Sequence, residues 1–342
     1  MTKTPMTSRI PRPRLILPDE FWDRSPSVPD INTFISQRIT VALQRGRIPW
    51  KVPVSHDPNC GLPCNVRTGG RYRSVNTLLL CDTYQTKGYR NKWWGTAEDW
   101  ASVGTAIKSG EEPTVIAQYR DAGCMIDPCL VFNAIQVHDA DEYQVMLTDG
   151  AIVANDEADF SLMGILLEHH APEIRYDVGD ERFGSDWNGY ISPEPFHDHP
   201  NHRNGDYILM QSERYFPFKS DFYSVMLHEI MHWTEVRTGW MHCLPVREFV
   251  AEVGMNILGL DLGVPHCLDS YNHYQWLKRW HSIFHKDETF FFWAMAQVDR
   301  ACDYLLRPIL EQECRVYHDE YSIAPPVKFT SGPDHMRFED TW

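Results

Sequence analysis

Two histidines stand four residues apart in the sequence His228-Glu229-Ile230-Met231-His232-Trp233. Residues four apart lie on one face of an α-helix, so both imidazoles can bind one metal ion. Glu229 follows the first histidine and can act as a general base on a metal-bound water. Zinc is the expected ion, because it binds imidazole nitrogen and a catalytic site keeps one position open for water. Mn²⁺ is the alternative ion, and a core helix that carries these side chains by chance is the alternative interpretation.

The residues around this motif favour a helix. Ser220 and Asp221 are candidate caps, and Thr238-Gly239 is a stop signal. Apolar side chains recur between these signals at helical spacing: Phe222, Val225, Met226 and Ile230. The motif is therefore expected on an amphipathic helix.

A third metal ligand is expected from a second amphipathic helix over 246–258. Glu248 and Glu252 share one face of it, and Gly239 offers a turn that returns the chain alongside the first helix. Glu248 is the predicted third ligand, and Glu252 is predicted to accept a hydrogen bond from a ligand histidine. The opposite assignment of the two glutamates and a solvated face that binds no metal are the alternatives.

Composition indicates a folded protein of about two domains, because 342 residues with 43% apolar and 13% aromatic content can bury a large core. No run of 18 apolar residues occurs, so no membrane span is expected. The basic, proline-rich residues 1–18 lack the apolar stretch of a secretory signal. Nine scattered cysteines suit a reducing compartment, which predicts a cytoplasmic protein.

Charge is distributed unevenly along the chain. Residues 1–120 hold 17 Lys and Arg against 10 Asp and Glu, a net charge of +7, which leaves −22 for the rest of the total of −15. A basic first third suggests that this part alone faces nucleic acid. An ordinary asymmetry that serves solubility is the alternative.

A turn-rich segment at 65–80 combines arginines with Gly69-Gly70 and leads into an apolar helix. Backbone amides at such a turn, flanked by guanidinium groups, can bind phosphate. Aromatic and cationic residues then interleave between Tyr84 and Trp94, a pattern typical of surfaces on which single-stranded bases stack. Core packing is the alternative for the aromatic residues. The predicted contacts to single-stranded nucleic acid are Arg67, Thr68, Arg71, Tyr72, Arg73, Asn76, Lys92 and Trp93.

The element order predicts an α+β protein with a small mixed domain followed by a second, acidic domain. Helices are expected at 30–43, 96–103, 156–169, 271–280 and 290–306, and strands at 114–119, 129–137 and 206–210. The last strand is a candidate sheet edge for an extended peptide. His273 or Tyr271 could stabilise an oxyanion, although packing is the simpler role. The histidines in the segment 177–205 could form a second metal site, but a surface loop is the favoured interpretation.

Motifs from both halves together resemble the ArdC antirestriction family of plasmids and phages. The carriers of the resemblance are Pro49-Trp50, Asn65, Thr68-Gly69, Tyr72, Asn76, Leu78-Leu79-Leu80, Phe132-Asn133, Gln136, Asp206-Tyr207-Ile208, Tyr223, the run from His228 to Thr234, Glu248 and Ala251-Glu252. The chain departs from the family pattern at Gly70, where lysine is common, and at Ser74, where glycine is common.

The resemblance implies a single-stranded-DNA-binding domain at 29–140 and a zincin-like metallopeptidase domain at 141–306, between an extended arm at 1–28 and a tail at 307–342. It implies metal ligands at His228, His232 and Glu248, with Glu229 as the catalytic glutamate. The implied function is protection of incoming DNA from restriction. Two alternatives stay open: a non-enzymatic DNA-binding protein with a structural or vestigial zinc site, and a protease directed by DNA to a protein or peptide substrate.

Overall fold

In a computed structural model of the chain, the N-terminal half is built on a four-stranded sheet. The structure describes residues 31–52, 57–120, 125–143, 158–178, 188–191, 205–265, 276, 279–280, 283 and 289–312. The strand order is β1-β2-β4-β3, with β1 parallel to β2 and the other pairs antiparallel. The strands are β1 (Cys64–Asn65), β2 (Trp93–Gly95), β3 (Thr114–Arg120) and β4 (Met125–Asn133).

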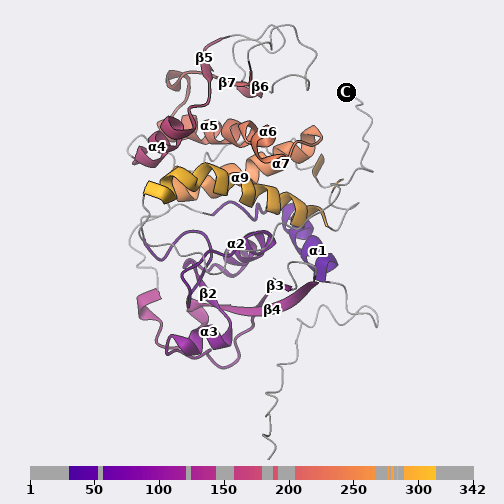
Figure 1. Ribbon diagram of the computed structural model, residues 1–342. Helices are drawn as coiled ribbons and strands as arrows, with labels where there is room; N and C mark the ends of the chain where they lie inside the picture. The colour runs from indigo at the N-terminus through magenta and orange to yellow at the C-terminus, as the bar shows by residue number, and fades with distance from the viewer. Residues whose placement is uncertain are drawn as a thin grey trace, which may run out of the picture. The chain divides into compact units, whose positions relative to one another are not determined.

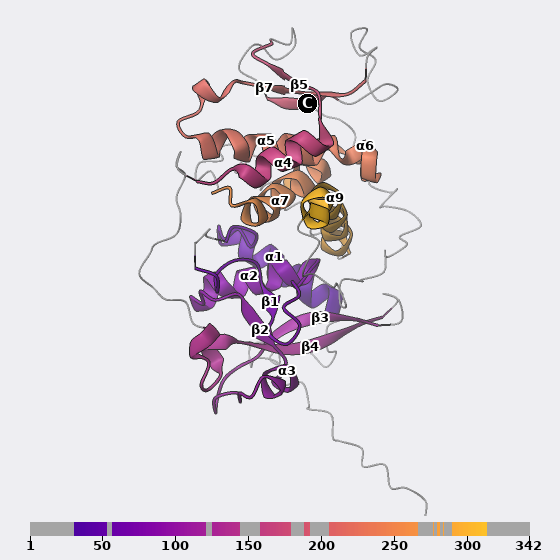
Figure 2. The ribbon, with the colours of Figure 1, turned by 60° about the vertical axis from the view of Figure 1, so that its left-hand side comes forward.

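Three helices accompany this sheet: α1 (Ile31–Gln44), α2 (Val75–Lys87) and α3 (Ala97–Ser102). Helices α1 and α2 lie on one side of the β3–β4 hairpin and α3 lies on the other (Figures 1 and 2). Helix α1 forms where the apolar spacing predicts it, and it buries Ile35 and Ile39. Helix α3 begins with a capping box between Thr96 and Asp99, which satisfies backbone donors that the first turn leaves free.

The C-terminal half combines a three-stranded sheet with five described helices. The strands are β5 (Ile174–Tyr176), β6 (Gly189–Ile191) and β7 (Tyr207–Met210). The helices are α4 (Ser161–His170), α5 (Lys219–Trp233), α6 (Glu235–Thr238), α7 (Leu244–Leu262) and α9 (Phe290–Gln312). In both views α5 runs next to the sheet, with α7 on its other side (Figures 1 and 2).

Strand β7 lies in the middle of its sheet, so the prediction of an edge strand at 206–210 is wrong. It pairs in parallel with β5 and antiparallel with β6. All four of its residues are buried, as expected for a strand with neighbours on both sides. Strand β6 is therefore the antiparallel edge of this sheet.

Aromatic packing joins the two halves in one core. The Trp50 ring lies 5.2 Å from that of Phe249 and 6.1 Å from that of Trp280, each pair at a steep angle. Trp50 belongs to the N-terminal half, and Phe249 follows the predicted ligand Glu248. Residues 31–342 accordingly group into one compact unit.

Most predictions for the ends and loops fall on residues that the structure does not describe. Helix α9 continues to Gln312, beyond the residue at which the tail was expected to begin. The arm at 1–28, Tyr271, His273, the histidines of the 177–205 loop and residues 313–342 lie outside the described residues. In the described part of the chain, no helix has both the length and the apolar character that crossing a membrane requires.

Candidate metal centre

Helix α5 carries the histidine motif, as the sequence predicts. Its buried face includes Phe222, Met226 and Ile230. Its start differs from the prediction, because Phe218 occupies the N-cap position and no side chain caps the helix. Ser220 and Asp221 instead lie inside the first turn, where both are buried.

Helix α7 places Glu248 opposite the two histidines. Pro245 stands at its first turn, where a missing N–H costs nothing, and Gly263 ends it in the left-handed conformation at φ 68°. The helices α5 and α7 approach closely at Gly254, where an added Cβ would lie 2.1 Å from Cε of Met231. A side chain at position 254 would therefore force Met231, inside the histidine motif, to repack.

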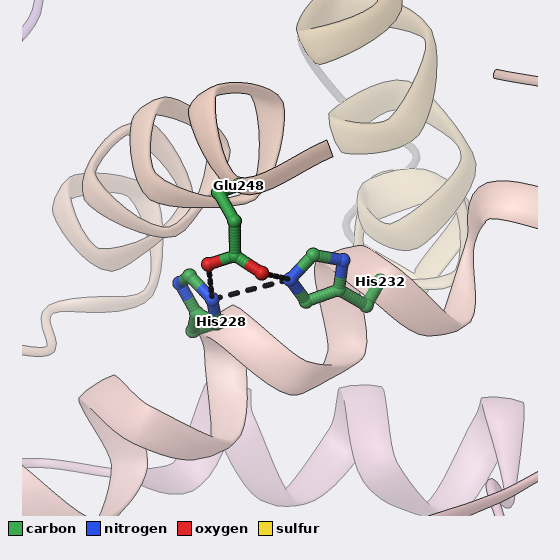
Figure 3. Close-up of side chains that lie close together, drawn as sticks. All are labelled: His228, His232 and Glu248. Atoms are coloured by element: carbon green, nitrogen blue, oxygen red, sulfur yellow. Dashed lines mark hydrogen bonds and ion pairs between the residues drawn. The ribbon is translucent and has the colours of Figure 1, made fainter. Parts of the chain in front are cut away.

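His228, His232 and Glu248 form a compact set of donor atoms (Figure 3). The two Nε2 atoms are 3.2 Å apart. Glu248 Oε2 lies 3.5 Å from Nε2 of His228, and its Oε1 lies 3.5 Å from Nε2 of His232. Donors bound tetrahedrally to zinc at about 2.0–2.1 Å are separated by about 3.4 Å. The three residues therefore fit one zinc-sized ion, with a fourth position left for water.

Electrostatics in the site also suit a cation. Burial alone would raise the pKa of Glu248, but the hydrogen bonds from His228 and His232 outweigh it and hold the pKa below its usual value. Burial alone would lower the pKa of His232, but its contacts with Glu235 and Glu248 raise it. Positive charge is thus favoured at the point where the three side chains converge.

Glu229 is buried on the same helix, and burial raises the pKa of its carboxyl group. The backbone N–H of Tyr190, in the edge strand β6, donates a hydrogen bond to this carboxylate. Tyr190 is itself held by a hydrogen bond from its hydroxyl to Asp206, and Asp206 is paired with Arg237 of α6. The sheet edge and the general-base candidate are therefore positioned together.

Glu235 is a site residue that the sequence reasoning missed. Its Oε1 lies 2.6 Å from Nδ1 of His232, and its side chain is fully buried. A carboxylate can only accept here, so Nδ1 carries the hydrogen and Nε2 is left to face the metal. Arg247 of α7 lies 2.8 Å from a Glu235 carboxylate oxygen and holds it in place. The available signal was a carboxylate three residues after the second histidine.

Glu252, which the sequence predicts to accept a hydrogen bond from a ligand histidine, is buried one turn after Glu248. Its backbone carbonyl accepts a hydrogen bond from Nδ2 of Asn256 at 2.7 Å, and its Oε1 lies 3.4 Å from the same nitrogen. The contact to a ligand histidine that has the predicted geometry is made by Glu235.

The predicted DNA contacts fall into two groups. Arg67, Thr68 and Arg71 are exposed on the turn before α2, which is organised by the Asn65 side chain through the amides of Arg67 and Thr68. All three arginines of this turn pair with carboxylates: Arg67 with Asp99, Arg71 with Asp261, and Arg73 with Asp299 and Asp303.

The second group is largely occupied by packing. The Asn76 amide exchanges two 2.8 Å hydrogen bonds with the backbone of Ala117 in β3. Trp94 and Tyr84 are buried, so they pack in the core. Trp93 is half-buried under Lys92 and donates from Nε1 to Asn59. Tyr72 accepts a hydrogen bond from Asn65. The turn at 65–74 is therefore the more accessible part of the predicted surface.

Comparisons with known protein families agree with both halves. Residues 29–149 match the N-terminal domain of anti-restriction factor ArdC, and residues 200–297 match a zincin-like metallopeptidase family. The chain thus combines an ArdC-type N-terminal domain with a zincin-like metallopeptidase domain, as the resemblance implied.

Solved structures show the same fold. The crystal structure of the antirestriction protein ArdC from plasmid R388 with Mn(II) bound is similar, with a TM-score of 0.62 and 21% identity. The likeness covers 82% of this chain and 98% of the other. The metal-free crystal structure of the same protein matches with a TM-score of 0.57.

Two curated relatives are DNA primases TraC of Escherichia coli, which are 22% and 23% identical over 304 residues. These alignments cover 80% of this chain but span only 19% and 26% of the relatives' own length. An uncharacterised protein of Sinorhizobium fredii, y4eC, is 29% identical over 100 residues, which cover 29% of this chain and 33% of y4eC.

Proposed function

We propose that this protein is an antirestriction protein of a mobile element that binds single-stranded DNA and carries a metal-dependent peptidase site. The observation that supports the peptidase site is the convergence of His228, His232 and Glu248 within 4.8 Å, beside a buried Glu229. The turn at 65–74 is the proposed DNA contact, because Arg67, Thr68 and Arg71 are exposed there.

Zn²⁺ is the proposed ion, held by Nε2 of His228, Nε2 of His232 and the Glu248 carboxylate. Mn²⁺ is the alternative, because a carboxylate ligand suits it as well. When bound, such an ion lowers the pKa of water and polarises a peptide carbonyl. The Glu229 carboxylate accepts the proton of the attacking water and delivers it to the leaving amide nitrogen. Glu235 keeps Nε2 of His232 directed at the ion.

The test of the peptidase site is Glu229→Gln, which keeps the shape of the side chain and removes the base. We expect this variant to bind Zn²⁺ as the parent does and to cleave fluorescent casein about 10²- to 10⁴-fold more slowly. Metal analysis and the cleavage rate provide the two readouts. Cleavage at the parent rate by the variant would refute the role of Glu229.

The test of DNA binding is the double substitution Arg71→Ala with Arg73→Ala, measured by anisotropy of labelled oligo(dT) at low salt. We expect weaker binding, because each arginine that neutralises a phosphate also releases a counterion. Glu98→Gln, an exposed change on α3, is the control for handling and folding. Unchanged affinity in the double variant would remove the turn from the proposed surface.

A second candidate function is a protease directed by DNA to its protein substrate. It is favoured by the aromatic core through Trp50 and Phe249, which joins the two halves in one unit. Cleavage of DNA-bound protein in preference to the same protein free in solution would support this function. If the metal-loaded chain cleaves the substrate protein neither on DNA nor free in solution, the result would instead support a non-enzymatic DNA-binding protein.

A further inference from the structure

The segment between β1 and α2 ends in a strained residue that is held from outside. Ser74, at the N-cap of α2, has φ 56° and ψ −144°, a region that residues with a side chain rarely occupy. No side chain of its own helix caps α2. The Ser74 backbone N–H instead donates to Oδ2 of Asp299, on α9, at 2.9 Å.

Arg73, the neighbouring residue, is bound by the same helix. Its Nη2 lies 2.6 Å from Oδ2 of Asp303 and donates to the Asp299 backbone carbonyl at 3.4 Å. Its Nε lies 3.7 Å from Oδ2 of Asp299. Asp299 and Asp303 are one turn apart on α9, so they face Arg73 and the Ser74 amide together.

A guanidinium group beside a backbone N–H at the start of a long helix is a donor set that suits phosphate. In this structure carboxylates occupy that donor set. We propose that Asp299 and Asp303 act as an internal phosphate mimic, which competes with single-stranded nucleic acid for Arg73 and the Ser74 amide. This inference rests on the proposed DNA binding and concerns its regulation.

The charges around the pair support displacement by a phosphate backbone. Arg71 pairs with Asp261 on α7, so three carboxylates face two arginines in this cluster. Oδ2 of Asp261 is buried without a hydrogen-bond partner among the described residues. Burial also raises the pKa of Asp299 to about 6, which means that its charge is held in an unfavourable environment. The two arginines therefore satisfy the three carboxylates of this cluster incompletely.

Asp303→Asn is the informative substitution, because the Asp303 side chain is 57% exposed and its loss should leave the fold intact. Glu168→Gln is the matched control, since it removes one charge from an exposed position on α4. Both variants carry the same change in net charge, but only Asp303→Asn removes a charged partner of Arg73.

The experiment is a titration of labelled oligo(dT) with the full chain at 50 and 200 mM salt. We expect Asp303→Asn to bind about 3-fold tighter or more at 50 mM, and its advantage to grow about 2.5-fold between 200 and 50 mM, the factor for one added phosphate contact on a single strand. Glu168→Gln should retain the salt slope of the parent. In an Arg73→Ala background the gain from Asp303→Asn should vanish.

The possible results separate this inference from the proposed function. If the parent binds oligo(dT) but Asp303→Asn behaves like Glu168→Gln, the mimic is refuted while DNA binding stands. A gain in oligo(dT) affinity from Asp303→Asn that persists in the Arg73→Ala background also refutes the mimic. If neither the parent nor Asp303→Asn or Asp299→Asn binds oligo(dT), both the mimic and the proposed DNA binding fail. If Asp303→Asn binds oligo(dT) and the parent does not, the result supports a mimic that blocks DNA binding completely in the parent.

Discussion

Replacement of Glu235 by Gln should weaken metal binding although Glu235 is not a ligand. The carboxylate lies 2.6 Å from Nδ1 of His232, and the exposed fractions of the two side chains are 0% and 6%. Gln keeps the size of the side chain and one acceptor oxygen, but it lacks the negative charge that makes Nε2 of His232 a stronger ligand for the metal ion. Loss of such an outer hydrogen-bond partner lowers metal affinity about 10- to 100-fold, which is about 1.4–2.7 kcal/mol.

The same substitution should also lower stability without metal. Arg247 lies 2.8 Å from the Glu235 carboxylate and is 18% exposed, so it would lose a charged partner in a largely buried place. Removal of one partner from a buried pair costs about 3–5 kcal/mol, and the remaining exposure of Arg247 puts the expected loss at the low end. The free energy of unfolding of metal-free protein measures this effect separately from affinity.

The assay for affinity is competition for Zn²⁺ with a chelator, at a temperature where circular dichroism shows both proteins folded. Glu252→Gln is the matched control, because Glu252 is a buried glutamate on α7 one turn from the proposed ligand Glu248. We expect its effect on affinity to be smaller than that of Glu235→Gln. If Glu252→Gln weakens Zn²⁺ binding as much or more, or if Glu235→Gln binds as the parent does, the assignment of Glu235 is refuted.

Two further predictions concern stability. Gly254→Ala should lower the free energy of unfolding by about 1–3 kcal/mol, because its Cβ would overlap Met231. Urea titration should show that the double variant with Met231→Ala loses less stability than the sum of the losses in the two single variants. Strict additivity of the two losses would contradict this overlap. Burial raises the pKa of Asp299 from 3.8 to about 6, so the folded protein binds this proton first and gains about 1 kcal/mol relative to Asp299→Asn as the pH falls from 7 to 5. A stability difference that is constant over this range would contradict the shift.

Helical period explains why most of the candidate metal centre could be predicted from the sequence. The four-residue spacing fixes His228 and His232 on one face, and the turn at Gly239 followed by a second helix brings Glu248 to them. Glu235 escaped notice because it lies beyond the end of α5, after the chain turns at Thr234 into α6. Thr234 keeps a right-handed helical conformation between the two helices, so the three-residue spacing still brings the Glu235 carboxylate to His232.

Errors elsewhere have a common physical origin in long-range contacts. The run Tyr207–Met210 is apolar at every position, a pattern of central strands, and β7 is indeed central. Interleaved aromatic and cationic residues before Trp94 suggested an exposed surface, but composition does not say which side faces the core. The partners of Arg71 and Arg73 lie about two hundred residues further along the chain, on α7 and α9, where no local pattern indicates them.

Helix α7 connects the metal centre to the arginine cluster, since Glu248 lies near its start and Asp261 near its end. Thirteen residues of helix separate these side chains by about 20 Å. Coupling along such a path requires an element with two arrangements, whereas α7 packs closely against α5 midway, where Gly254 meets Met231. We therefore expect Zn²⁺ to change oligo(dT) affinity less than about 5-fold, below the usual range of allosteric coupling. A DNA-directed protease of this design would act by bringing its substrate close, and a larger effect of Zn²⁺ on DNA affinity would show that α7 moves.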